Sequence, residues 1–219
     1  VRNQHEVWVV NHLSDSVSII RLDGRHGQAR VVRTLHVGDE PRDIVFGGPD
    51  GNLAFITTAH RGQNTGDDPD LHNPATGRAD VWVFDADNLG SAAGGERLNK
   101  LVLFADTPRA LAVSADGSRV YAAPFYSGNR TTVASKEAVA TVYADRVDPT
   151  NPFFFFENDG SRQPLTSRVV KYKAGADGSY HWYDDQGTNF DAWVRVQLPD
   201  YDVFTIDATQ YPPQQIQAQ

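Results

Sequence analysis

The sequence predicts an all-β protein, and two observations carry this prediction. Short runs of β-branched and aromatic residues alternate with a period of two over the first 125 residues, and no stretch there keeps a helical apolar stripe. Turn residues such as Asp23-Gly24, Gly38-Asp39 and Pro49-Asp50-Gly51 separate the runs. With 219 residues, of which 40% are hydrophobic and 22% charged, the chain is long enough to bury a sizeable core.

The expected strands form a regular series along the chain. Each is rich in residues that suit a pleated, half-buried surface. In chain order, strands are expected at residues 7–10, 17–20, 31–35, 43–46, 53–56, 81–84, 101–104, 110–113 and 119–122. A hairpin is expected around Asp177-Gly178, between residues 169–172 and 180–183, and a further strand at 203–206.

A repeat groups these strands into units of four. The segment that runs from Pro41-Arg42 to an Asp-Gly turn recurs 67 residues later from Pro108-Arg109 to another Asp-Gly turn. The segment 80–85 likewise matches residues 16–20 and 202–207. Radially stacked units of four antiparallel strands, each about 40 to 45 residues long, make up a β-propeller. The sequence therefore predicts about three four-stranded propeller blades, incomplete in this chain, with an insertion at 61–78.

Several of these segments resemble a known family. Residues 7–11, the strand at 16–20 and the Val37-Gly38…Pro41 junction resemble YVTN-type β-propeller repeats of bacterial and archaeal surface proteins, over about residues 5–125. Other segments are similar to large secreted bacterial propeller proteins, some of which carry a c-type cytochrome domain; these are residues 58–62, 80–85, 127–129 and 198–204. The resemblance implies an extracellular, cell-surface or periplasmic location in a bacterium, and a cytochrome c domain as one candidate partner.

Three parts are expected along the chain. Residues 1–130 hold the YVTN-like blades. Residues 131–210 are expected to be a decorated, irregular β region that continues the propeller within its third blade. The Phe153–Phe156 run is expected in its core, with contact to a partner as the alternative. Residues 211–219 contain two prolines and four glutamines, and we expect a tail or linker there.

Composition excludes several classes of function. The net charge of −8 argues against a nucleic-acid surface, which needs clustered positive charge. Because the chain has no cysteine, disulfides, thiolate metal sites and a c-type haem attached to this chain are excluded. No apolar run approaches the roughly 18 residues that a membrane span needs. The chain also has no methionine, even at position 1, so we expect a processed or trimmed piece of a longer polypeptide.

Propeller geometry predicts which side chains gather at one mouth of the central channel. The loops that lead into the innermost strands contribute Arg42 and Arg109, and the loops that follow the second strands contribute His12, His60 and Tyr126. Arginine suits carboxylates and phosphates, and imidazole is a common ligand of copper, zinc and iron. These five residues therefore form a candidate ligand, metal or partner site. In the alternative interpretation, the arginines pair with blade carboxylates and the histidines cap strand ends.

The insertion offers a weaker candidate site. Asp67, Asp68 and Asp70 supply the oxygen ligands that calcium prefers. Their spacing does not match an EF-hand loop, because no Gly stands at the sixth position and no Glu at the twelfth. A solvated acidic loop is the alternative.

The chain lacks the linear motifs of the common catalytic classes. It has no Gly-x-Ser-x-Gly elbow, no phosphate-binding Gly-Lys-Ser/Thr loop and no His-Glu-x-x-His helix. We therefore expect a binding or scaffolding module without a cofactor of its own, completed by blades from another segment or chain. The alternative is the propeller part of a redox enzyme. In that case His12, His60 and Arg42 would hold copper or dock a cytochrome domain, with copper or haem on a partner segment.

Overall fold

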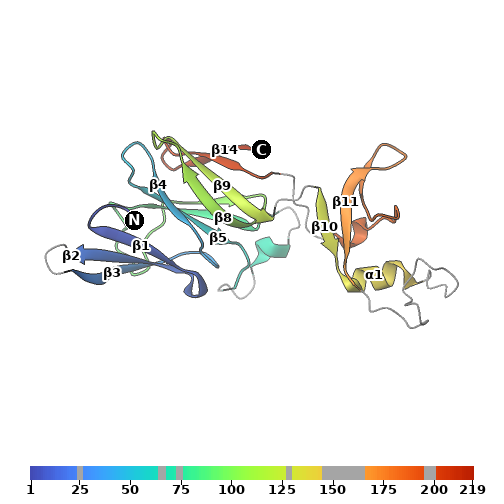
Figure 1. Ribbon diagram of the computed structural model, residues 1–219, viewed down its shortest axis with the longest axis horizontal. Helices are drawn as coiled ribbons and strands as arrows, with labels where there is room; N and C mark the ends of the chain where they lie inside the picture. Colours follow the sequence, from blue (N-terminus) through green and yellow to red (C-terminus); the bar gives the residue numbers. More distant parts are fainter. Residues whose placement is uncertain (24–26, 64–67, 73–75, 127–129, 145–165, 195–200) are drawn as a thin grey trace. The chain divides into compact units, whose positions relative to one another are not determined.

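The computed structural model confirms the all-β prediction and divides the chain into two compact units. It describes residues 1–23, 27–63, 68–72, 76–126, 130–144, 166–194 and 201–219. Unit 1 comprises Val1–Ser127 and Leu198–Gln219, and unit 2 comprises Gly128–Gln197 (Figure 1). The predicted Phe153–Phe156 core segment lies outside the described residues.

Unit 1 contains three antiparallel sheets of the kind expected for propeller blades. The first sheet has three strands in chain order: β1 (Glu6–Asn11), β2 (Ser16–Asp23) and β3 (Gln28–His36). The second has four strands in chain order: β4 (Ile44–Gly47), β5 (Leu53–Ala59), β6 (Ala79–Asp85) and β7 (Asn99–Leu103). The third has the order β8 (Asp106–Val113), β9 (Arg119–Tyr126), β13 (Phe204–Asp207) and β14 (Gln214–Ala218). Two short 3-10 helices, η1 (His12–Ser14) and η2 (Pro69–His72), lie in its loops.

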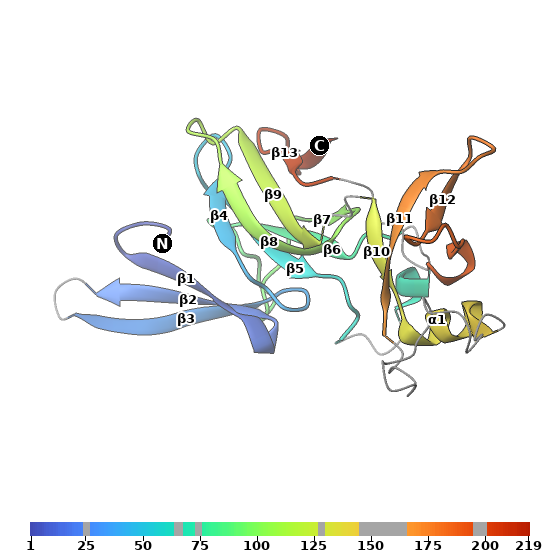
Figure 2. The same ribbon diagram turned by 45° about the vertical axis from the view of Figure 1, so that its right-hand side comes forward.

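The third sheet is completed by residues that follow unit 2 in the chain. Strand β13 lies antiparallel beside β9, with Phe204 opposite Ala122 and Asp207 opposite Arg119 (Figure 2). The expected tail or linker at 211–219 is wrong, because most of it forms β14 and pairs with β13. The side chains of β14 are mostly exposed at the outer edge of the sheet, so its glutamine-rich sequence shows no buried apolar pattern.

The middle sheet packs against a neighbouring sheet on each side. Every residue of β5 is buried, and successive residues point to opposite faces. Phe55 contributes to a core with the third sheet that includes Val120, Phe204 and Ile206. Ile56, next in the strand, contributes to a core with the first sheet that includes Trp8 and Leu35. The strands of the middle sheet are therefore apolar on both faces.

The described part of unit 2 combines a small sheet with an α-helix. The sheet has the order β10 (Thr131–Ala134), β11 (Arg168–Ala174) and β12 (Tyr180–Tyr183), and a 3-10 helix η4 (Asp191–Trp193) follows it. The sequence did not predict helix α1 (Lys136–Val142). The Ser135 hydroxyl accepts a hydrogen bond from the Ala138 N–H and caps this helix at its start. Val139 and Tyr143 then pack against Trp182 of the sheet.

Because β13 supplies core side chains to unit 1 across a long chain separation, we expect Phe204→Ala to unfold unit 1 more easily. Phe204 is buried in the core, and removing its ring should cost about 3–5 kcal/mol of unfolding free energy. Thr205→Ala, on the opposite face of the same strand, is the matched control and should cost less than about 1 kcal/mol. Urea unfolding monitored by tryptophan fluorescence measures both. Equal losses would contradict the packing of β13.

Candidate functional site

A band of charged side chains, which we call the polar rim, lies at one end of the sheets of unit 1. Its members come from the loops before β4 and after β5, from the start of β6, from the neighbouring strand β7, and from the start of β8. They are Asp39, His60, Arg61, Asp68, Asp80, Lys100 and Asp106. Backbone hydrogen bonds align these segments: the Ala59 N–H donates to the Asp39 carbonyl, and the His60 N–H donates to the Arg78 carbonyl.

The imidazole of His60 is the centre of the rim. Its side chain is only 7% exposed and lies between two carboxylates. Nε2 is 2.9 Å from Asp68 Oδ2, and Nδ1 is 3.7 Å from Asp80 Oδ1. The hydrogen bond with His60 lowers the pKa of Asp68. His60 therefore ties the insertion, which carries Asp68, to strand β6, which carries Asp80.

Asp80 is a buried carboxylate whose negative charge is only partly compensated by neighbouring groups. Burial raises its pKa to about 6, although Lys100 and His60 both act in the opposite direction. Lys100 Nζ lies 3.7 Å from Asp80 Oδ2, which is longer than a good hydrogen bond. Asp80 Oδ1 and His60 Nδ1 are both buried and have no hydrogen-bond partner in the described part of the chain. With its pKa raised to about 6, the Asp80 carboxyl changes charge close to neutral pH.

A glycine is required where the first loop of the rim passes the middle sheet. A Cβ on Gly38 would lie 2.6 Å from Thr58 Oγ1 and 2.8 Å from Trp82 Nε1. Both distances are shorter than van der Waals contact, so a larger residue would displace the loop from the sheet. The Val37-Gly38…Pro41 junction singled out in the sequence is thus explained by close backbone approach.

Asp39 and Arg61 extend the rim across all three sheets. Asp39 Oδ2 accepts hydrogen bonds of 3.0 Å from the N–H groups of both Arg61 and Gln63, which orders the first residues of the insertion. The Arg61 guanidinium in turn donates to Asp106 Oδ1 at 2.8 Å and to Thr107 Oγ1 at 2.5 Å. The arrangement is a network that holds loops together, with its most buried members at His60 and Asp80.

In the part of the chain that the structure describes, no hydrogen bond or ion pair joins the side chains of His12, Arg42 or Arg109 to a member of the rim. His12 is half-buried in η1, and Arg42 is half-buried and forms an ion pair of 3.5 Å with Glu40. Arg109 is exposed, with its guanidinium carbon 3.8 Å from the centre of the Phe125 ring. In the described residues no hydrogen bond or ion pair joins His12, Arg42, Arg109 and His60 to one another.

Tyr126 is the last residue of β9 and pairs through its backbone with Asp106 of β8. Asp106 also forms an ion pair with an arginine of the rim. That arginine is Arg61, and in the described residues neither Arg42 nor Arg109 forms an ion pair with Asp106.

The calcium candidates of the insertion have other partners. Asp68 bonds to His60 and accepts the N–H of Asp70, and Asp70 itself is exposed in η2. Asp67 lies outside the described residues. Across the residues that the structure describes, no group of three or more His, Asp or Glu side chains could hold a metal ion.

Sequence reasoning missed Asp39 and Asp80, although a signal for Asp80 was present. Asp80 is a carboxylate at the start of a strand whose next four residues are apolar, and it lies directly opposite Thr58. An ionisable residue within such a run is rarely left without partners. No comparable linear signal marks Asp39.

Comparisons with known proteins leave the family open. No protein-family model matches the chain, and no curated protein matches it. Among solved structures, a protein from Lactobacillus plantarum is similar at 10% identity and a TM-score of 0.41, over 94% of this chain and 43% of its own. The periplasmic gluconolactonase PpgL of Pseudomonas aeruginosa is similar at 15% identity and a TM-score of 0.40, over 98% and 67%. The dihydro-heme d1 dehydrogenase NirN is similar at 14% identity and a TM-score of 0.35, over 97% and 35%.

The chain thus spans less than half the length of the Lactobacillus protein and of NirN. Because each TM-score is below 0.5, none of these similarities assigns a function to the chain. Function has to be inferred from its own residues.

We expect Asp80→Asn to stabilise the protein at pH 7 and to leave its stability at pH 4 nearly unchanged. The folded-state pKa of Asp80 is raised to about 6 from 3.8, so its contribution to stability is complete below about pH 4 and is lost as the pH rises through about 6. The neutral amide removes this penalty, which is worth about 1–3 kcal/mol at pH 7. Urea unfolding at both pH values measures the difference.

The exposed carboxylate Asp70, changed to Asn, is the control for Asp80→Asn and should show no comparable gain. A loss of stability in Asp80→Asn at pH 7 would instead show that the ionised carboxylate is stabilised by His60 and Lys100 by more than its burial costs.

Proposed function

We propose that this chain is part of a larger YVTN-type β-propeller that acts as a binding or scaffolding module outside the cytoplasm. The observation that carries the proposal is the surface of the third sheet that faces away from the core of unit 1. We call it the outward face; it comprises Ala110 and Ala112 of β8 and Tyr121 and Ala123 of β9. None of these four side chains is charged, and the charges of Arg119 and Asp207 farther along the face are paired with each other.

The outward face has the composition of a surface that another sheet covers. Tyr121 is 39% exposed, and Ala110 and Ala112 are exposed as well. The alternate residues of β9, Val120 and Ala122, already lie in the core. Strands that are apolar on both faces are typical of sheets packed on both sides, and contiguous exposed apolar surface marks interaction sites.

A further propeller blade is the partner that fits this surface. Within unit 1, the middle sheet buries apolar residues of this kind against a sheet on each side. The same packing applied to the outward face calls for a fourth sheet, supplied by another segment of the same polypeptide or by another chain. The resemblance to repeats of surface proteins supports a location outside the cytoplasm. In the described residues, no helix is both long and apolar enough to cross a membrane.

The alternative is a redox enzyme with copper on the rim or a cytochrome docked beside it. The surroundings of His60 disfavour copper, because Nε2 is hydrogen-bonded to Asp68 and Nδ1 is buried against Asp80. Docking of a cytochrome depends on Arg42 and Arg109, and would appear as salt-sensitive binding that weakens when both are replaced.

If the outward face is covered by another sheet, the purified chain should self-associate or bind the missing blades. Sedimentation velocity should show species heavier than the 24.1 kDa of one chain, at a fraction that increases with concentration. Ala112→Glu combined with Tyr121→Glu places two charges opposite each other on this face and should abolish the association. The exposed Leu13, changed to Glu, is the control and should leave it intact. A wild-type chain that stays monomeric and does not bind further blades would contradict the proposal.

Metal analysis separates the proposed function from the copper alternative. After incubation with copper and desalting, we expect less than one equivalent bound per chain and no change in His60→Ala, since the His60 ring nitrogens face carboxylates. One equivalent of copper that His60→Ala removes would favour the redox alternative.

A further inference from the structure

The sheet of unit 2 has two unlike faces. Val170 and Trp182 point to the inner face and pack with helix α1. The side chains of β11 that point to the opposite, outer face are exposed. They belong to Val169, Lys171 and Lys173. A hollow of about 460 Å³ lies on this outer face. Its lining includes Arg168, Val169, Lys171 and Lys173 of β11, and Asp184 and Asp185, which follow β12.

A buried carboxylate holds one cation of this hollow in place. The Asp184 side chain is fully buried, and its Oδ2 accepts hydrogen bonds from the Tyr143 hydroxyl and from Arg168 Nη1, the latter at 2.8 Å. Its Oδ1 accepts the N–H groups of Gln186 and Thr188. Burial alone would raise the pKa of Asp184, but these hydrogen bonds lower it. The ionised Asp184 therefore fixes the position of Arg168.

One guanidinium nitrogen forms ion pairs with both carboxylates of the hollow. Arg168 Nη1 lies 2.8 Å from Asp185 Oδ1 as well as from Asp184 Oδ2. In contrast, neither Lys171 nor Lys173 has a carboxylate at ion-pair distance among the described residues. The lining of the hollow thus carries three cations against two carboxylates, a net charge of +1, and the two lysine ammonium groups are the cations without a carboxylate partner in the described part of the chain.

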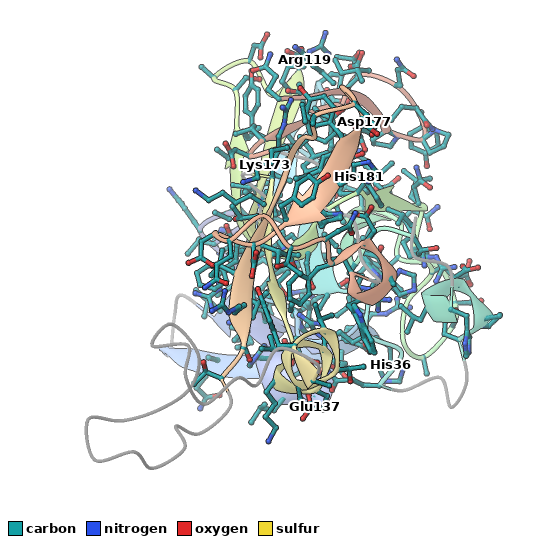
Figure 3. The ribbon with its side chains drawn as sticks, turned by 90° about the vertical axis from the view of Figure 1, so that its right-hand side faces the viewer. His36, Arg119, Glu137, Lys173, Asp177 and His181 are labelled. Atoms are coloured by element: carbon teal, nitrogen blue, oxygen red, sulfur yellow. The ribbon has the colours of Figure 1, made fainter. Side chains whose placement is uncertain are left out.

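The other charged groups near Lys173 have hydrogen-bond partners of their own. Lys173 lies opposite His181 in the β11–β12 hairpin, and Figure 3 shows both together with Asp177. Asp177 Oδ2 accepts the Ser179 hydroxyl at 2.6 Å, and His181 Nδ1 is 2.6 Å from Asp191 Oδ2. Lys173 Nζ lies 5.8 Å from the centre of the Tyr183 ring, which leaves the ammonium group able to take an anion.

We propose that this hollow binds a small organic dianion. Two lysines two residues apart on one strand have their Cα atoms roughly 7 Å apart, a spacing that suits two acidic groups on a short carbon skeleton. Lysine ammonium groups pair with carboxylate or phosphate as compact point charges. Val169, which is 58% exposed beside Lys171 on the same face of β11, and the lysine stems offer an apolar floor for the skeleton.

The site belongs to unit 2 alone, so it stands whether or not unit 1 assembles with further blades. A dianion is favoured over a monoanion because two lysines without a carboxylate partner among the residues described line the hollow. It is also favoured over a polyanionic surface, because Asp185 is 81% exposed at the margin and would repel extended negative charge.

Isothermal titration calorimetry of the full chain with succinate, at low ionic strength, tests this proposal. We expect saturable binding at one site per chain, and at least tenfold weaker binding of acetate. Lys171→Ala combined with Lys173→Ala should weaken succinate binding at least tenfold. Lys136→Ala is the matched control, because Lys136 lies in α1 of the same unit and pairs with Glu137. Its affinity for succinate should equal that of the wild type.

Two results would overturn the proposal: no saturable binding of succinate by the wild-type chain, or unchanged affinity in the Lys171/Lys173 double variant. Both lysines are exposed, so far-UV circular dichroism and thermal melting should show that the double variant folds as the wild type does. The Ala112→Glu/Tyr121→Glu variant of the outward face should bind succinate with wild-type affinity. This separates failure of the anion site from failure of the proposed assembly.

Discussion

The pairing of β9 with β13 is the constraint on which the rest of unit 1 depends. It places Phe204 and Ile206 in the core beside Val120 and gives β14 a strand to pair with. Without it the third sheet would keep only β8 and β9, and the core against the middle sheet would lose one wall. Because β9 and β13 are neighbours, the chain between them leaves and returns at the same place, and unit 2 can fold around its own core.

The polar rim follows from the same architecture. Three sheets that pack through apolar faces bring their strand ends together, where backbone groups need partners beyond the strand ladders. Carboxylates supply many of them: Asp39 accepts two backbone N–H groups, and Asp43 of the loop before β4 accepts the Leu111 N–H of the third sheet at 2.7 Å. Burial of His60 between Asp68 and Asp80 is a result of this crowding. The main role of the rim is therefore to join the sheets. Any chemistry that its residues perform has to be compatible with the hydrogen bonds that do so.

Part of the site could be predicted from the sequence, but not how its residues combine. His60 was singled out as a channel-mouth residue and Asp68 as a calcium candidate, for unrelated reasons, and the structure bonds them to each other. Linear spacing does not reveal such a pair, because the two residues lie eight positions apart in a segment without a strand pattern. The cationic hollow of unit 2 was missed for a different reason. Its two lysines are ordinary exposed residues of a strand, and only the ion pairs of Arg168 with Asp184 and Asp185 show which charges remain uncompensated.

The sequence by itself determined the all-β class, the positions of most strands and the repeated four-stranded unit. Alternating apolar residues and turn residues act over a few positions, so a linear pattern records them directly. Only the tertiary structure decided that the glutamine-rich end is strand β14, that residues 136–142 form a helix, and that the third sheet closes across unit 2. These features depend on contacts between segments far apart in the chain. The pairing of β13 with β9 gives β14 an ordered strand to pair with, and α1, which the adjacent Ser135 caps, packs against the distant Trp182. Such contacts leave no periodic trace in the sequence.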